Sequence, residues 1–120
     1  MVRQLREAGY DVTTTAEALA LARDADAIAT RLVRTAGTYL GQVLSGVVNF
    51  FNPHAVFLTG SMSSSEPFLA AVRSRVHANC HPLVTQTLRI EAAATGADAI
   101  LLGAARLAID TLDLAAAGSA

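Results

Sequence analysis

Apolar residues recur every three or four positions through the first half of the chain. The members of this stripe are Ile28, Leu32, Ala36, Leu40, Val43 and Val47. Such spacing is one face of a helix with 3.6 residues per turn. Asn52-Pro53 follows, and proline disfavours helical backbone in the residue before it. The pattern therefore predicts a long helix over residues 25–50.

Gly37 and Gly41 lie four positions apart in this helix, so they share one side of it. Each glycine costs roughly 1 kcal/mol of helix propensity, which packing has to offset. We therefore expect a neighbouring backbone to approach the helix closely at these two positions.

Shorter helices are predicted by capping patterns. Thr14 and Glu17 have the spacing of a capping box, which starts a helix near residue 15, and residues 1–13 before it are expected to form a short helix and a loop. Asp24 or Asp26 is expected to cap the long helix. Ser65 and Pro67 begin another helix, because proline is harmless in the first turn. Its apolar face consists of Phe68, Leu69, Val72 and Val76.

Two short apolar runs, residues 55–59 and 88–92, have the length of buried strands. The helix between them implies a parallel pair with a right-handed crossover. Because two strands rarely make a stable sheet, we expect this sheet to continue outside the chain. A last helix is predicted over residues 97–112. Its buried candidates are Ile100, Leu101, Ala104, Ala105 and Leu107.

The composition agrees with a chain that buries apolar surface against another chain or a missing domain. It is 52% hydrophobic and 16% charged, whereas soluble domains usually have about 25% charged residues. The net charge is −1, and the nine basic residues are scattered along the sequence. Nucleic-acid binding needs a basic stripe, so this segment is not expected to bind DNA directly.

A metal site, secretion and membrane insertion are each disfavoured. His77, Cys80 and His81 are fewer than the four ligands of a structural zinc site, so a loop after a helix is the favoured interpretation. A single cysteine allows no internal disulfide, which favours a location in the cytoplasm. The uncharged residues 35–52 include several polar side chains and fit a buried soluble helix better than a membrane span.

Thr59, Gly60, Ser61 and Met62 form the most function-like segment, a turn between a strand and a helix. Ligands of α/β proteins collect outside the carboxyl ends of parallel strands, where helix N-termini favour anions. Any turn of this kind also needs a flexible residue, and from the spacing alone that structural interpretation is favoured over a ligand site. The carboxylates are separated and no base accompanies the serines, so no catalytic or metal-binding residues are predicted.

The order of several landmarks resembles the ROK family (repressor, open reading frame, kinase) over residues 13 to 112. The landmarks are Ala22-Arg-Asp24-Ala-Asp26-Ala27, Ala36-Gly37-Thr-Tyr-Leu40-Gly41, Val47-Val-Asn49-Phe-Phe-Asn52-Pro53, Val56-Phe-Leu-Thr-Gly60, Leu88-Arg-Ile, Gly96-Ala-Asp98-Ala99 and Leu102-Gly103-Ala104-Ala105. The resemblance implies an α/β fold. The chain would be part of one lobe of the actin-like ATPase (ribonuclease H-like) fold, with two parallel strands packed against four or five helices. Residues 1–13 would be an extension, 14–114 the ROK-like subdomain and 115–120 a disordered tail.

The resemblance also implies a function. Kinase members have an aspartate-glycine phosphate loop and a sugar-contacting segment that this sequence lacks, so the chain alone is not expected to catalyse phosphoryl transfer. Thr59 stands where kinases commonly have the first of two glycines, which favours the repressor branch. The chain is then the C-terminal part of a sugar-responsive transcriptional repressor, without a cofactor, acting in ligand-lobe structure and dimerisation. Its expected partners are a second copy or a missing N-terminal lobe, and the full-length protein would bind a sugar.

Two other interpretations stay open. In the kinase alternative the chain is the nucleotide-binding part of a glucokinase-like sugar kinase, and residues 59–62 touch ATP. In the third, the chain is a small helical protein unrelated to this family.

Overall fold

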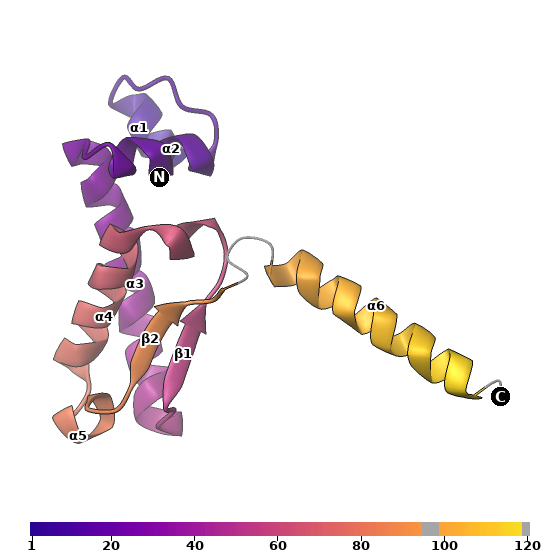
Figure 1. The fold of residues 1–120 in the computed structure, drawn as a ribbon. Helices are drawn as coiled ribbons and strands as arrows, with labels where there is room; N and C mark the ends of the chain where they lie inside the picture. The colour runs from indigo at the N-terminus through magenta and orange to yellow at the C-terminus, as the bar shows by residue number, and fades with distance from the viewer. Residues whose placement is uncertain (95–98, 119–120) are drawn as a thin grey trace.

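The computed structural model describes residues 1–94 and 99–118, which form helices around a short parallel sheet (Figure 1). In chain order the elements are α1 (Val2–Glu7), α2 (Thr15–Arg23), α3 (Ala27–Phe51), β1 (Ala55–Leu58), the 3-10 helix η1 (Ser61–Ser64), α4 (Glu66–Asn79), α5 (Pro82–Thr85), β2 (Arg89–Ala92) and α6 (Ala99–Gly118).

The contact between α3 and α4 organises the molecule, and the two glycines make it close. A Cβ atom added at Gly37 would lie 2.5 Å from the carbonyl oxygen of Phe68, and one added at Gly41 would lie 2.9 Å from that of Val72. The predicted close approach of a neighbouring backbone is therefore confirmed, and the neighbour is α4.

The most buried face of α3 lies beside the predicted stripe instead of on it. It consists of Ala29, Val33, Gly37, Gly41, Ser45 and Val48. Most of these residues are small because the backbone of α4 lies against them, and the larger side chains flank the contact. The predicted stripe is half-buried as far as Leu40, but Val43 and Val47 are 68% and 43% exposed.

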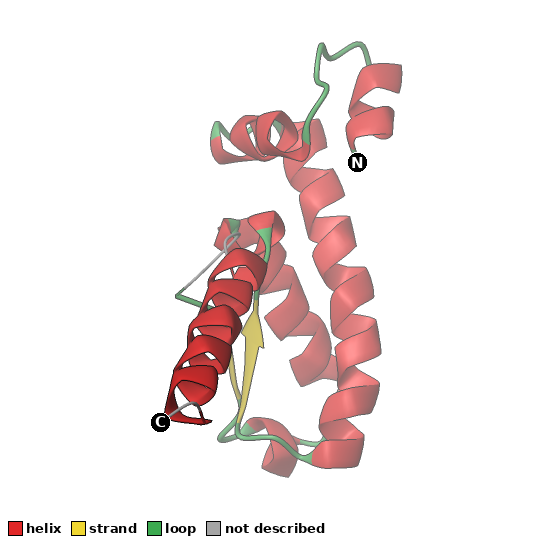
Figure 2. Cartoon of the chain, turned by 90° about the vertical axis from the view of Figure 1, so that its right-hand side faces the viewer, coloured by secondary structure: helices red, strands yellow, loops and turns green. Residues whose placement is uncertain are grey.

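The two strands lie side by side and run parallel, as predicted, with Ala55 opposite Arg89 and Leu58 opposite Ala92. Each is slightly shorter than the predicted 55–59 and 88–92. Side chains alternate between the two faces of the sheet. Ile90 is buried toward the helices, whereas Phe57 is exposed, with the Arg89 guanidinium 6.0 Å from its ring centroid. In Figure 2 the helices α3 and α4 lie to the right of the two strands, on one side of the sheet.

Side-chain caps begin α2 and α3, and the cap of α3 also holds the N-terminal segment through Tyr10. The Glu17 backbone N–H donates to Thr14 Oγ1 (3.2 Å), and Glu17 Oε2 accepts from the Thr14 N–H in return (3.2 Å). Asp26 caps α3 by accepting from the Ala29 N–H (2.9 Å) and from the Tyr10 hydroxyl (2.7 Å). Those two bonds lower the pKa of Asp26, and the bond to Asp26 raises the pKa of Tyr10. The expected capping box and aspartate cap are both confirmed.

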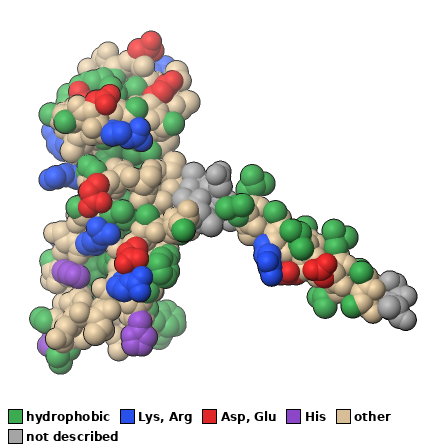
Figure 3. All heavy atoms as spheres, in the orientation of Figure 1, with side chains coloured by type: hydrophobic (Ala, Val, Ile, Leu, Met, Phe, Trp, Pro, Cys, Tyr) green, Lys and Arg blue, Asp and Glu red, His purple; other side chains and the backbone are tan. Residues whose placement is uncertain are grey.

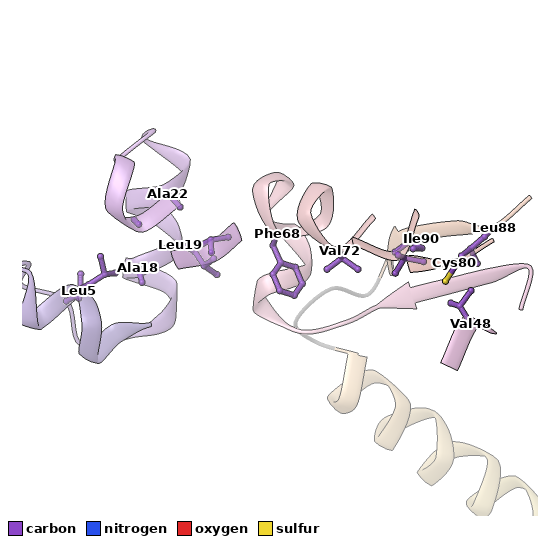
Figure 4. Packing of buried hydrophobic residues seen from close by; sticks show 14 residues of the cluster. Leu5, Ala18, Leu19, Ala22, Val48, Phe68, Val72, Cys80, Leu88 and Ile90 are labelled. Atoms are coloured by element: carbon purple, nitrogen blue, oxygen red, sulfur yellow. The ribbon is translucent and has the colours of Figure 1, made fainter. Parts of the chain in front are cut away.

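One hydrophobic cluster runs from the N-terminal helices to the sheet. Leu5, Ala18, Leu19 and Ala22 lie at one end, and Val48, Phe68, Val72, Cys80, Leu88 and Ile90 lie toward the other (Figure 4). No helix in the described ranges is long and apolar enough to cross a membrane.

The prediction for the last helix is wrong in two respects. It extends to Gly118 instead of ending near residue 112, so residues 115–118 of the expected tail are helical. Leu101, Ala104, Ala105 and Leu107 were expected to be buried and are exposed; the side chain of Ile100 lies outside the described part. Figure 1 shows α6 standing away from the other elements. The apolar pattern identified a helix correctly, but its packing partner is not among the described residues.

Substituting Gly41 should test the close contact of α3 with α4. We expect Gly41→Ala to lower the free energy of unfolding by about 1–3 kcal/mol, because the new methyl group forces the two backbones apart. The measurement is urea denaturation followed by circular dichroism. Gly103→Ala in α6 is the matched control: open space surrounds it, so it should cause no loss. Equal stability of Gly41→Ala and wild type would contradict the packing described.

The capping box should make stability depend on pH. Hydrogen bonds from the backbone N–H groups of Thr13 and Thr14 lower the pKa of Glu17. The box therefore contributes stability above the unfolded-state pKa of a glutamate, and this contribution is lost as the pH falls through the lower folded-state pKa. We expect the free energy of unfolding of Glu17→Gln to decrease less than that of wild type between about pH 5 and pH 3. Thr14→Ala should instead lower the free energy of unfolding by about 1 kcal/mol. If Glu17→Gln lost as much stability as wild type on acidification, Glu17 would not be the group responsible.

Candidate ligand-binding turn at the carboxyl end of the sheet

The turn after β1 depends on the backbone conformation of Gly60. Its φ is 95° and its ψ is 173°, a region that side chains with a Cβ atom rarely adopt. Since β1 and β2 are parallel, the turn lies at the edge where both strands have their carboxyl ends. The chain therefore changes direction at Gly60, at the edge of the sheet where α/β proteins bind ligands.

Hydrogen bonds within the segment hold the turn in place. The Gly60 carbonyl accepts from the Ser63 backbone N–H (3.1 Å) and from the Ser63 hydroxyl (2.7 Å), and the Met62 carbonyl accepts from the Ser65 N–H (3.0 Å). Ser63 is buried. These bonds make residues 61–64 a 3-10 helix, where the sequence predicted only a polar turn, and Ser63 is the residue that sequence reasoning missed.

The four predicted site residues have different surroundings. Thr59 and Ser61 are exposed, and their hydroxyls make no hydrogen bond within the described residues. A Cβ atom at Gly60 would meet nothing within 4 Å, so the space above it is open. Met62 is half-buried against the core. The turn can therefore offer a ligand two hydroxyls and the backbone of Gly60, but the Met62 side chain serves packing.

A pocket of about 280 Å³ adjoins this turn. Its lining residues come from α2 and from the start of α4: Leu19, Ala22, Arg23, Ser64, Ser65, Glu66 and Pro67. Sequence reasoning could not find it, because its two walls are more than forty positions apart. Only the fold brings them together.

The charges of the pocket disfavour a phosphate. The N-terminus of α4 would attract an anion, but Glu66 occupies the first turn of that helix and puts a carboxylate on the pocket wall. Arg23 on the opposite wall offsets this charge. With two serine hydroxyls and an apolar side, the pocket suits a neutral polar group better than a phosphate.

Cys80 and His81 each make a local hydrogen bond. The Cys80 thiol is buried with Sγ 3.7 Å from the Ser45 carbonyl oxygen. His81 caps α5, with Nδ1 accepting from the Leu83 N–H (3.2 Å), and His77 lies in the last turn of α4. The described part of the chain contains no group of three or more His, Cys, Asp or Glu side chains placed to hold a metal ion.

The conformation of Gly60 should be costly for any other residue. We expect Gly60→Ala to lower the free energy of unfolding by about 1–2 kcal/mol through backbone strain alone, since its methyl group would meet no other atom. Denaturant unfolding measures the effect, with Ser61→Ala as an exposed neighbour that should change little. Full stability in Gly60→Ala would show that the turn does not require this backbone geometry.

Comparison with known proteins relates this arrangement to one family. The ROK family matches residues 2–111 of the chain, a range that includes most of the segment set apart above as an extension. The xylose repressor of Bacillus spizizenii is 32% identical over 75 residues, which are 62% of this chain and 20% of the repressor.

A solved structure shares the fold. It is the crystal structure of a ROK family transcriptional regulator described as a homolog of the E. coli MLC protein, and it superposes with a TM-score of 0.66 at 23% identity. The alignment covers 71% of this chain and 22% of that one. The chain thus spans about a fifth of the length of either protein. Its parallel strands and packed helices are part of an actin-like ATPase fold, and the chain belongs to the ROK family.

Proposed function

We propose that the chain is the C-terminal part of a ROK-type, sugar-responsive transcriptional repressor. The observation that carries this proposal is the match to the xylose repressor, a regulator named for a sugar. The ROK structure of similar fold is also a transcriptional regulator. The part proposed for this chain is to complete the lobe that binds the sugar and to support dimerisation.

The chemistry of the chain supports a binding role over catalysis. Phosphoryl transfer needs a metal, a base and substrate-positioning groups brought together. Three carboxylates of the described residues are instead used locally: Asp26 and Glu17 cap helices, and Glu91 pairs with Arg89 at 3.0 Å. We therefore propose no catalytic residue in this chain.

Two features argue against ATP as a ligand of the turn. Thr59 places a β-branched side chain beside Gly60, where a nucleotide would need close access to the backbone. Glu66 then puts a negative charge at the helix N-terminus that would otherwise attract phosphates. We propose that the protein works without a nucleotide cofactor.

A kinase role is the second candidate, and the open space above Gly60 favours it. In that alternative Thr59, Gly60, Ser61 and Met62 lie against ATP. Their available hydroxyls and backbone fit a nucleotide's polar groups, but the nearby carboxylate does not fit its phosphates.

Partners and location follow from the regulator role. A sugar would bind in the full-length protein, and a repressor that acts on DNA works in the cytoplasm. DNA contacts are assigned to another part of the protein, since this chain has a net charge of −1.

DNA binding and ATP use of the full-length protein separate the two roles. We expect the full-length protein to bind DNA from the region upstream of its own gene. Xylose or another inducing sugar should weaken that binding at least about tenfold, which corresponds to a coupling free energy of about 1.4 kcal/mol. Fluorescence anisotropy measures it, and the 120-residue chain alone should not bind. Sugar-dependent consumption of ATP would overturn the proposal. Thr59→Gly is the matched variant: it should tighten ATP binding only if the kinase reading is right.

A further inference from the structure

We draw no further inference here: the strongest candidate, the groove between α3 and α4 that the exposed side chains of Arg34, Thr38, Ser74 and Arg75 line, carries none because nothing in the structure shows what covers it in a protein of which this chain is about a fifth.

Discussion

Two glycines let the backbone of α4 lie directly against α3, and the positions of the strands follow from that contact. Gly37 and Gly41 leave no room for a Cβ atom against the carbonyl groups of α4. Since α4 connects the two strands, fixing it on α3 also fixes the crossover and places the carboxyl ends of β1 and β2 together. The turn at Gly60 and the pocket beside α2 therefore depend on a packing contact on the far side of the sheet. Ordinary side-chain packing keeps helices 8–10 Å apart, and only small residues allow a closer approach.

Local patterns predicted the parts of this fold that local chemistry determines. The capping box at Thr14 and Glu17, the aspartate cap of α3 and the end of α3 before Pro53 each depend on neighbours in sequence, and each is found in the structure. The long apolar stripe was a poorer guide to the buried face of α3. Periodicity gives weight to large apolar side chains, whereas the tightest contact is made by Gly37, Gly41 and Ser45.

Contacts between distant segments were beyond the reach of these patterns. The pocket beside the turn combines Leu19 and Arg23 of α2 with Ser65 and Glu66 at the start of α4, and no spacing rule relates those positions. The hydrogen bonds of Ser63 were missed for a different reason. A run of serines in a polar turn gives no indication of which hydroxyl will be buried. Sequence reasoning thus identified the turn as the candidate site but not the walls of its pocket.

The exposed apolar surfaces are the strongest physical sign that this chain does not work alone. A parallel sheet is normally covered on both faces, because its strands arise from crossovers that place helices there. Here the helices cover one face, Phe57 and Arg89 lie on the other, and the large apolar side chains of α6 are exposed (Figure 3). Burying an exposed leucine or phenylalanine contributes about 1.5–3 kcal/mol of stability. Covering the exposed apolar side chains of this chain would therefore stabilise it considerably. The chain spans only a fifth of its relatives, and two separate surfaces remain to be covered.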